Sequence, residues 1–448
     1  MQIIVGGAGR IGTYLTHALI QNGHSVTVVD DNHERLHILG RLHDIAIRHG
    51  SITNGEILEK LFEETCDLFI GVTDSEEANI LACIAAKKMG KARTVARLKN
   101  NSLLRPAFNS GAIFHVDHFV IPELLVAEEI NRMVRTSSAS SKKFFFGSAE
   151  LRTITIPHSW RHAKMSLHDL KSAPVNMVIG AILRHESEGT RLIIPHGDDV
   201  LFPGDQLAVV TDSTSMRDVL HFFDLKEPHV KKIFINGGGR IGFQVVQLLQ
   251  DFVPNIYISD TSLERCRHLA KHLQKASVIH QTVSDWAFIR EQAIAQSDWY
   301  IGCGKNEEHN ILTSLLSKEL GCPNVLACIN DESEARLAEK LGLSFLVSER
   351  IVATNQMIPW VHHGNVQSML SLFSGRVEVS HVTVSKESSF IGVPLSELGP
   401  KLPPDLLIAV MYRNEHVLVA DGSQKLVPGD HVIIITTPQN RKFVRTLF

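Results

Sequence analysis

The sequence lacks an excess of charge of either sign, because 45 lysines and arginines nearly balance 48 aspartates and glutamates and leave a formal net charge of −3. A dedicated nucleic-acid-binding protein would need a basic face, so this balance argues against one. No apolar run approaches the roughly 18 residues of a membrane-spanning helix. Residues 1–6 begin a strand-like pattern at once, so no secretory signal is expected.

Motifs of disulfide-bonded, metal-binding and hydrolytic proteins are also lacking. None of the six cysteines belongs to a CxxC pair, which predicts free, buried thiols. The 24 histidines are scattered and include no HExxH motif, so no metal site is predicted. We find no GxSxG motif, no Ser/His/Asp set and no Lys–Tyr pair, so no catalytic residue is predicted. The cysteines are Cys66, Cys83, Cys266, Cys303, Cys322 and Cys328.

What the sequence does contain is an internal repeat. The glycine-rich turn GAGRIG (7–12) returns as GGGRIG (237–242), and IGVTDSEEANIL (70–81) returns as IGCGKNEEHNIL (301–312). Each of these large modules is followed by a smaller module that also repeats. The order of large, small, large and small modules indicates an internal duplication.

Polar segments divide the chain between these modules. RTSSASSKK (135–143) and HHGNVQSMLSLFSGR (362–376) are expected to separate each large module from its small one. The expected segments are the first large module (1–122), a crossover helix and linker (123–142), the first small module (143–225), the second large module (230–350), a second crossover helix and linker (351–370) and the second small module (371–448).

Strand-like and helix-like patterns alternate along each large module. The strand-like segments of the first are QIIVGG, SVTVVD, DIAIRHG, DLFIGVT and ARTVARL, with helical patterns between them. This alternation predicts an α/β fold with a doubly wound parallel sheet of the Rossmann type. The small modules contain short strands around turns such as Pro203-Gly204-Asp205, which predicts a small β-rich α+β domain, resembling a sandwich with one or two helices.

The first glycine-rich turn lies between a predicted strand and a predicted helix, as a dinucleotide-binding turn requires. Gly7 permits the tight turn, Gly9 lets a pyrophosphate approach the backbone, and Gly12 lets helix and strand pack closely. The free N–H groups of the helix then face the phosphate. Asp30 ends the second strand, where its carboxylate can accept hydrogen bonds from ribose hydroxyls and repel a 2′-phosphate. Glycines that serve packing alone are the alternative.

Other predicted strands end at the same crevice. Ser51 follows the third strand, Thr73 and Asp74 follow the fourth, and Arg97 ends the fifth. The Arg97 guanidinium can make a charge-assisted contact with phosphate. An exposed arginine that binds nothing is the alternative for Arg97, and capping of the next helix is the alternative for Asp74 and Ser75.

The second large module keeps its glycines and an aspartate, Asp260, at the end of its second strand. It has Gly304 in place of Thr73, Lys305 in place of Asp74 and Cys328 in place of Arg97. The second module therefore either binds a dinucleotide-like ligand with different phosphate contacts or is a relic of the duplication. The two halves are not expected to be equivalent.

Two classes of function are compatible with these patterns. A nucleotide-dependent dehydrogenase needs a substrate domain that places an acid or base against the nicotinamide, and the small modules supply no such residues. A regulatory protein needs only that nucleotide occupancy biases a conformational equilibrium.

The order of the modules, the two glycine-rich turns and the segments VDDNHERL, GVTDSEEANILACIAAKKMG and VARLKN resemble the TrkA family over essentially the whole chain. These proteins are peripheral subunits of bacterial Trk potassium uptake systems, built from tandem RCK (also called KTN) domains. The resemblance implies no enzyme activity, but a cytoplasmic regulatory subunit on the inner face of the cell membrane. It would bind NAD(H) and, as regulatory ligands, ATP and ADP. Its partners would be a Trk-type membrane potassium transporter and further copies of the chain in a tetrameric ring.

The resemblance also assigns binding residues. In the first half, Asp30 would bind ribose, Ser51, Thr73 and Asp74 would line the adenosine or ribose pocket, and Arg97 would bind phosphate. In this family the helix after Pro122 packs across to a neighbouring module, and burial within its own module is the alternative. The turn and second-half residues assigned in this way are Gly7, Ala8, Gly9, Arg10, Ile11 and Gly12, with Gly237, Gly238, Gly239, Arg240, Ile241, Gly242 and Asp260.

Overall fold

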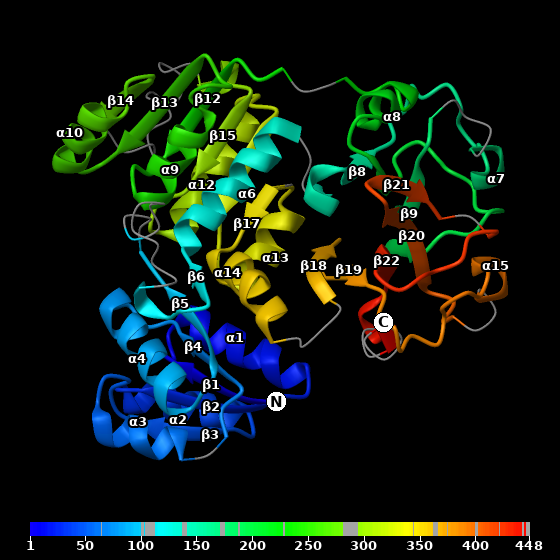
Figure 1. Ribbon diagram of the computed structural model, residues 1–448. Coiled ribbons are helices and arrows are strands. Elements are labelled where there is room, and N and C mark those ends of the chain that lie inside the picture. The colour runs from blue at the N-terminus through cyan, green and yellow to red at the C-terminus, as the bar shows by residue number, and fades with distance from the viewer. Residues whose placement is uncertain are drawn as a thin grey trace. The chain divides into compact units, whose positions relative to one another are not determined.

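The modules are grouped in two compact units in the computed structural model of the chain. It describes residues 1–63, 65–99, 103, 113–136, 141–170, 175–186, 189–226, 229–280, 294–343, 345–361, 366–373, 375–398, 402–420, 422–440 and 443–444. Met1–Val134 and Val230–Val361 form one unit, and Arg135–His229 and His362–Phe448 form the other. The two large modules therefore fold together, and so do the two small modules (Figure 1).

The first large module is a six-stranded parallel sheet with strand order β3-β2-β1-β4-β5-β6. The order reverses between β1 and β4, which opens a crevice at the carboxyl ends of these strands. Polar side chains of Asn32, Asn54 and Ser75 cap three of its helices. Its strands and helices are β1 (Gln2–Gly6), α1 (Arg10–Gln21), β2 (Ser25–Asp30), α2 (His33–Leu42), β3 (Ala46–His49), α3 (Gly55–Phe62), β4 (Leu68–Gly71), α4 (Glu76–Met89), β5 (Arg93–Arg97) and β6 (His118–Val120).

The second large module repeats this topology with strand order β14-β13-β12-β15-β16-β17, again entirely parallel. The predicted doubly wound α/β fold is thus confirmed in both halves. Its elements are β12 (Lys232–Asn236), α9 (Arg240–Leu249), β13 (Asn255–Asp260), α10 (Leu263–His272), β14 (Ala276–His280), β15 (Trp299–Gly302), α12 (Glu307–Glu319), β16 (Asn324–Cys328), α13 (Glu332–Lys340) and β17 (Phe345–Val347).

The two large modules exchange a helix. Helix α6 (Pro122–Thr136) follows the first module, but its apolar face belongs to the hydrophobic core of the second, beside β12 and α9 (Figure 1). Helix α14 (Glu349–Met357) follows the second module and packs against α1 in the core of the first. The prediction that the helix after Pro122 crosses to a neighbouring module is confirmed, and the neighbour is the other half of the same chain.

This exchange predicts that a change in α6 weakens the second module. Ile130 is fully buried in that module's core, so Ile130→Ala should lower the free energy of unfolding by roughly 3 kcal/mol. Hydrogen exchange should accelerate in β12 and β13. The control is Ile38→Ala on α2, where the side chain is 54% exposed and a change within about 0.5 kcal/mol is expected. Faster exchange confined to the first module would contradict the shared core.

The small modules are five-stranded sheets with equivalent orders, β10-β9-β11-β8-β7 and β18-β19-β22-β20-β21. The predicted Pro203-Gly204-Asp205 turn has Gly204 at φ +89°. The elements are β7 (Ser141–Phe144), β8 (Ala149–Thr155), α7 (Leu167–Leu170), β9 (Val178–Glu186), β10 (Gly189–Ile193), β11 (Gln206–Asp212), α8 (Met216–Phe222), β18 (Val366–Leu372), β19 (Val377–Thr383), α15 (Leu395–Leu398), β20 (Leu406–Arg413), β21 (His416–Val419) and β22 (His431–Thr436). Short 3-10 helices are η3 (Phe145–Gly147), η4 (Ile294–Gln296), η5 (Ile358–Trp360) and η7 (Pro438–Asn440).

A sandwich within each small module is the wrong interpretation. Each module has a single sheet, and one face of each sheet contributes to a shared core that joins Leu151 and Val210 to Val379 and Ile433. The contact is close at Gly180, where a Cβ would lie 2.0 Å from the Ile435 side chain. The sandwich is therefore made by the two halves together. The segments expected as polar breaks also contribute to strands, since β7 begins in the first of them and β18 lies within the second.

All six cysteines are free and buried, as the sequence predicts. Among the described residues, no helix combines the length and the apolar character that crossing a membrane requires.

Candidate functional site

A large cavity lies where the carboxyl ends of the strands of both large modules meet. It has a volume of about 1100 Å³ and is lined by both glycine-rich turns, so the two predicted sites open into one space. Predicted site residues that line it are Gly7, Gly9, Arg10, Ile11, Asp30, Ser51, Thr73, Asp74, Arg97, Gly239, Arg240 and Ile241. Those that do not line it are Ala8, Gly12, Gly237, Gly238, Gly242 and Asp260.

The glycines of the first turn have different roles. Gly7 has φ +117°, a conformation that other residues rarely adopt, and a Cβ on Gly12 would lie 1.8 Å from the carbonyl oxygen of Gly7. A Cβ on Gly9 would meet nothing within 4 Å. Packing therefore explains Gly7 and Gly12, whereas Gly9 leaves open space at the start of α1. The second turn repeats this arrangement at Gly237, Gly239 and Gly242, except that a Cβ on Gly239 would meet one side-chain atom at 3.9 Å.

Helices α1 and α9 follow directly after Gly9 and Gly239, and no side chain caps either helix. The first N–H groups of a helix have no partner within the helix, so they are available to an anion in the cavity. The positive end of the helix dipole points in the same direction. Each turn therefore offers an anion site built from backbone.

Asp30 is held in place by the turn that it adjoins. Its carboxylate accepts a hydrogen bond from Ala8 N at 2.5 Å and another from Asn32 N at 2.8 Å. Asp260 does the same with Gly238 N at 2.9 Å and Ser262 N at 2.8 Å. Asp30 lines the cavity while it fixes the conformation of the glycine turn, a second role that its position at the end of a strand did not reveal.

A buried asparagine organises the next strand end in both halves. Asn79 accepts a hydrogen bond from Thr73 N at 2.9 Å and donates one to the carbonyl oxygen of Arg97 at 3.0 Å. Asn310 makes the equivalent bonds with Gly304 N at 2.9 Å and the carbonyl oxygen of Cys328 at 3.0 Å. Sequence reasoning missed this residue, although the repeated letters NIL in EEANIL and EEHNIL mark it.

Of Asp74 and Ser75, only Ser75 caps the next helix, whereas Asp74 contacts Arg97. Ser75 caps α4, because its hydroxyl accepts a hydrogen bond from Ala78 N at 3.1 Å. Asp74 is not a cap. Its side chain is 87% exposed and lies 3.2 Å from the guanidinium of Arg97.

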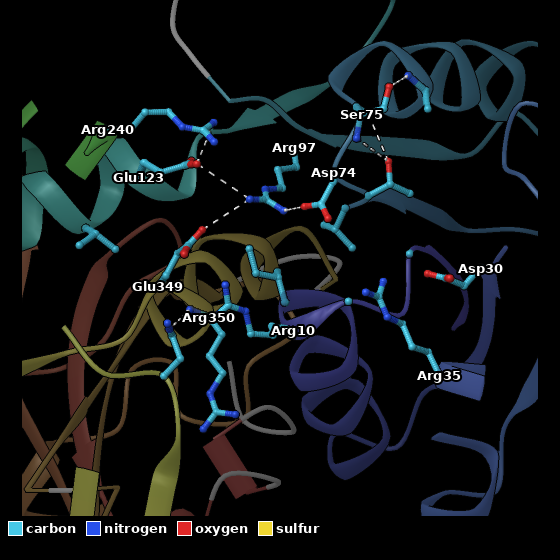
Figure 2. Close-up of a pocket in the computed structure, with 18 of the residues that line it drawn as sticks. Arg10, Asp30, Arg35, Asp74, Ser75, Arg97, Glu123, Arg240, Glu349 and Arg350 are labelled. Carbon is cyan, nitrogen blue, oxygen red and sulfur yellow. Dashed lines mark hydrogen bonds and ion pairs between the residues drawn. The ribbon is translucent and has the colours of Figure 1, made fainter. Parts of the chain in front are cut away.

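Arg97 is the central charged group of the cavity. Its side chain is only 13% exposed, so the interpretation as an exposed surface arginine is wrong. Arg97 contacts two glutamates in addition to Asp74. Its Nη2 atom lies 3.5 Å from Glu349 and 4.0 Å from Glu123 (Figure 2). These two glutamates begin the exchanged helices α14 and α6. One guanidinium from β5 therefore holds the first turns of both exchanged helices.

The two glutamates share further arginines. Arg240, from the second glycine turn, lies 3.1 Å from Glu123 (Figure 2). Burial and the charge of Glu123 raise the pKa of Glu349, and Arg97, Arg10 and Arg240 partly offset this rise. Residues that line the cavity thus set the protonation of a carboxyl at the start of α14.

The second half has different chemistry at the same positions. The strand register pairs Gly71 with Ala96 and Gly302 with Ala327, so Cys328 occupies the position of Arg97, as the repeat predicts. Burial raises the pKa of the Cys328 thiol well above its usual value, so this thiol is neutral. Lys305 and Gly304 also line the cavity. In the first half, the cation Arg97 at the end of a strand contacts both exchanged helices. In the second half, the neutral Cys328 takes its place.

Comparison with known sequences gives matches along the whole chain. The family model of the TrkA-N domain matches residues 3–122 and 233–349, and that of the TrkA-C domain matches residues 379–448. The chain is 28% identical over 445 residues to "Trk system potassium uptake protein TrkA homolog 1" of Methanosarcina mazei, an alignment that covers 97% of both chains. It is 26% identical over 462 residues to "Trk system potassium uptake protein TrkA" of Haemophilus influenzae, which covers 100% of this chain and 98% of the relative.

Comparison with solved structures supports the fold. The crystal structure of the GsuK RCK domain matches with a TM-score of 0.63 at 16% identity, and covers 100% of this chain and 94% of that one. The GsuK channel bound to NAD matches with a TM-score of 0.63 at 17% identity, and covers 100% and 78%. At this identity the match establishes a common fold and no more.

Proposed function

The chain belongs to the TrkA family, whose TrkA-N domain it carries twice, and on that premise we propose that it is the regulatory subunit of a Trk-type potassium uptake system. The curated relatives that match over their full length are named for potassium uptake and not for a catalysed reaction. In this proposal the chain controls a Trk-type membrane potassium transporter from the cytoplasmic face of the membrane. Several copies form a ring, which we expect to be tetrameric.

The regulatory ligands in this proposal are NAD(H), ATP and ADP. The observation that carries it is the single cavity into which two uncapped helix N-termini point, with Asp30 beside the first. A pyrophosphate fits the open space at Gly9, and the Asp30 carboxylate can accept ribose hydroxyls and disfavour a 2′-phosphate. Ser51 and Thr73 would line the adenosine or ribose pocket.

Regulation requires that a ligand has different affinities for two conformations. Arg97 and Arg240 are suited to this, because each lies in the cavity and also contacts an exchanged helix. A phosphate that attracts these guanidinium groups competes with Glu123 and Glu349 for them. The extra phosphate of ATP relative to ADP would change this competition most.

Thermal unfolding of the full-length protein tests nucleotide binding. NADH, NAD, ATP and ADP should each raise the unfolding midpoint, because a ligand at 100 times its dissociation constant adds about 2.7 kcal/mol to the stability of the folded state. NADP should have little effect, since Asp30 disfavours its 2′-phosphate. Absence of any shift with all five nucleotides would contradict the proposal.

The dehydrogenase alternative is tested in the same samples. Incubation with NAD and small alcohols or hydroxy acids, followed at the absorbance of NADH, should show no turnover. Turnover that depends on the glycine turn would favour the enzyme and would require the regulatory proposal to be abandoned.

A further inference from the structure

A buried carboxyl group, that of Glu123, and a partly buried one, that of Glu349, lie around Arg97 in the cavity's charged cluster. Glu123 is 8% exposed and Glu349 has a side chain that is 20% exposed, and one oxygen of each lies within 4.0 Å of the same nitrogen of Arg97. The second oxygen of Glu123 is buried and has no hydrogen-bond partner among the described residues. Burial and the neighbouring Glu123 raise the pKa of Glu349, and nearby arginines partly offset this rise.

The compensating cations are groups that a nucleotide would also attract. Arg97 and Arg240 contact the carboxylates directly, Arg10 acts on Glu349 from the start of α1, and all three arginines line the cavity. Arg10 and Arg240 belong to the glycine turns themselves. A phosphate bound at these turns therefore withdraws positive charge from Glu123 and Glu349.

We propose that binding of a phosphate-bearing nucleotide makes Glu349, beside Glu123, take up a proton, so that the site binds nucleotide and proton together. This inference rests on the proposed nucleotide-binding function and adds a second ligand, the proton, to it. A protonated Glu349 carboxyl is a hydrogen-bond donor, and the unpartnered oxygen of Glu123 is an acceptor available to it.

The groups that face Glu349 set the sign of the effect. They are Arg97 from β5, Arg240 from α9, Arg10 from α1, Glu123 from α6 and the neutral Cys328 thiol from β16. The pKa of Glu349 is already raised in the free protein, and withdrawal of the arginines raises it further. Proton uptake on binding occurs at pH values between the pKa of Glu349 in the free protein and its pKa in the nucleotide-bound protein. It vanishes well above both values. Nucleotide affinity should therefore increase as pH falls through this interval.

Isothermal titration calorimetry of the full-length protein with ATP measures the uptake. The titration is run at several pH values from about 5 to about 8, at each pH in two buffers with different enthalpies of ionisation, and EDTA is present so that no divalent cation compensates the carboxylates. The dependence of the binding heat on the buffer should correspond to uptake of up to about one proton per bound nucleotide. Equal heats in both buffers at every pH overturn the inference.

Two variants separate Glu349 from other sources of protons. Glu349→Gln should bind ATP and lose most of the uptake, and any uptake by the ATP phosphates themselves persists in it. Glu77→Gln is the matched control, because Glu77 also lines the cavity but is exposed, and it should behave as the natural protein. Unchanged uptake in Glu349→Gln, or equal loss in both variants, overturns the inference. No binding heat with any nucleotide would instead contradict the proposed function.

Discussion

Gly12→Ala should destabilise the first large module by roughly 3 kcal/mol or more, because the added methyl group would lie 1.8 Å from the backbone oxygen of Gly7. A backbone atom cannot move aside as a side chain can. The turn also carries the hydrogen bond from Ala8 to Asp30, so the strain reaches the end of β2. Thermal unfolding should show a midpoint lower by roughly 6 °C or more.

Gly9→Ala is the matched control, with the same chemical change three residues earlier. Gly9 has φ −73°, and a Cβ there meets nothing within 4 Å, so the fold should lose no more than about 1 kcal/mol. Nucleotide affinity should nevertheless fall at least about tenfold, which is roughly 1.4 kcal/mol, because the methyl group occupies the space proposed for the pyrophosphate. Equal stability of the two variants would contradict the conclusion that Gly12 is required for packing and that Gly9 only keeps space open in the cavity.

Arg97→Ala should lower the free energy of unfolding by roughly 3 kcal/mol, because it leaves Glu123 and Glu349 buried without their common cation. The loss should depend on pH. The pKa of Glu349 is raised in the folded protein, so its ionisation at higher pH destabilises the fold. Loss of Arg97 raises this pKa further, and the destabilisation at high pH becomes larger. Denaturant unfolding should therefore show a larger difference from the natural protein at about pH 8 than at about pH 5.

Arg35→Ala is a suitable control, since Arg35 lines the same cavity but is exposed, and little change in stability is expected. The Arg97 variant also tests the proposed role in phosphate discrimination. Its dissociation constants for ATP and ADP should become similar. An Arg97→Ala protein that is as stable as the natural one, or that still distinguishes ATP from ADP, would contradict these roles.

The topology of the large modules could be predicted from the sequence because local patterns encode it. Alternation of strand and helix, with a glycine-rich turn after the first strand, is enough to predict a doubly wound sheet, and the repeat predicts it twice. The repeat also predicts equivalent positions correctly, including Cys328 for Arg97. These features depend on residues close together in the chain.

Contacts between distant segments could not be predicted in the same way. The sequence does not show that Glu123 and Glu349 both lie against one arginine of the first module. The strand patterns of the small modules also do not indicate whether a sheet packs against a second sheet of the same half or against the sheet of the other half. Both features depend on how the halves meet, which periodicity does not record.

The helix exchange has a consequence for synthesis of the chain on the ribosome. Helix α6 leaves the ribosome with an apolar face whose partners extend to β17, which ends at Val347. At about 5–20 residues per second, this face waits roughly 10 to 40 s for its core to be complete. The first module waits for α14 as well, so neither large module is complete until almost four-fifths of the chain exists. A chain released before that point would therefore lack the complete cavity that both large modules line.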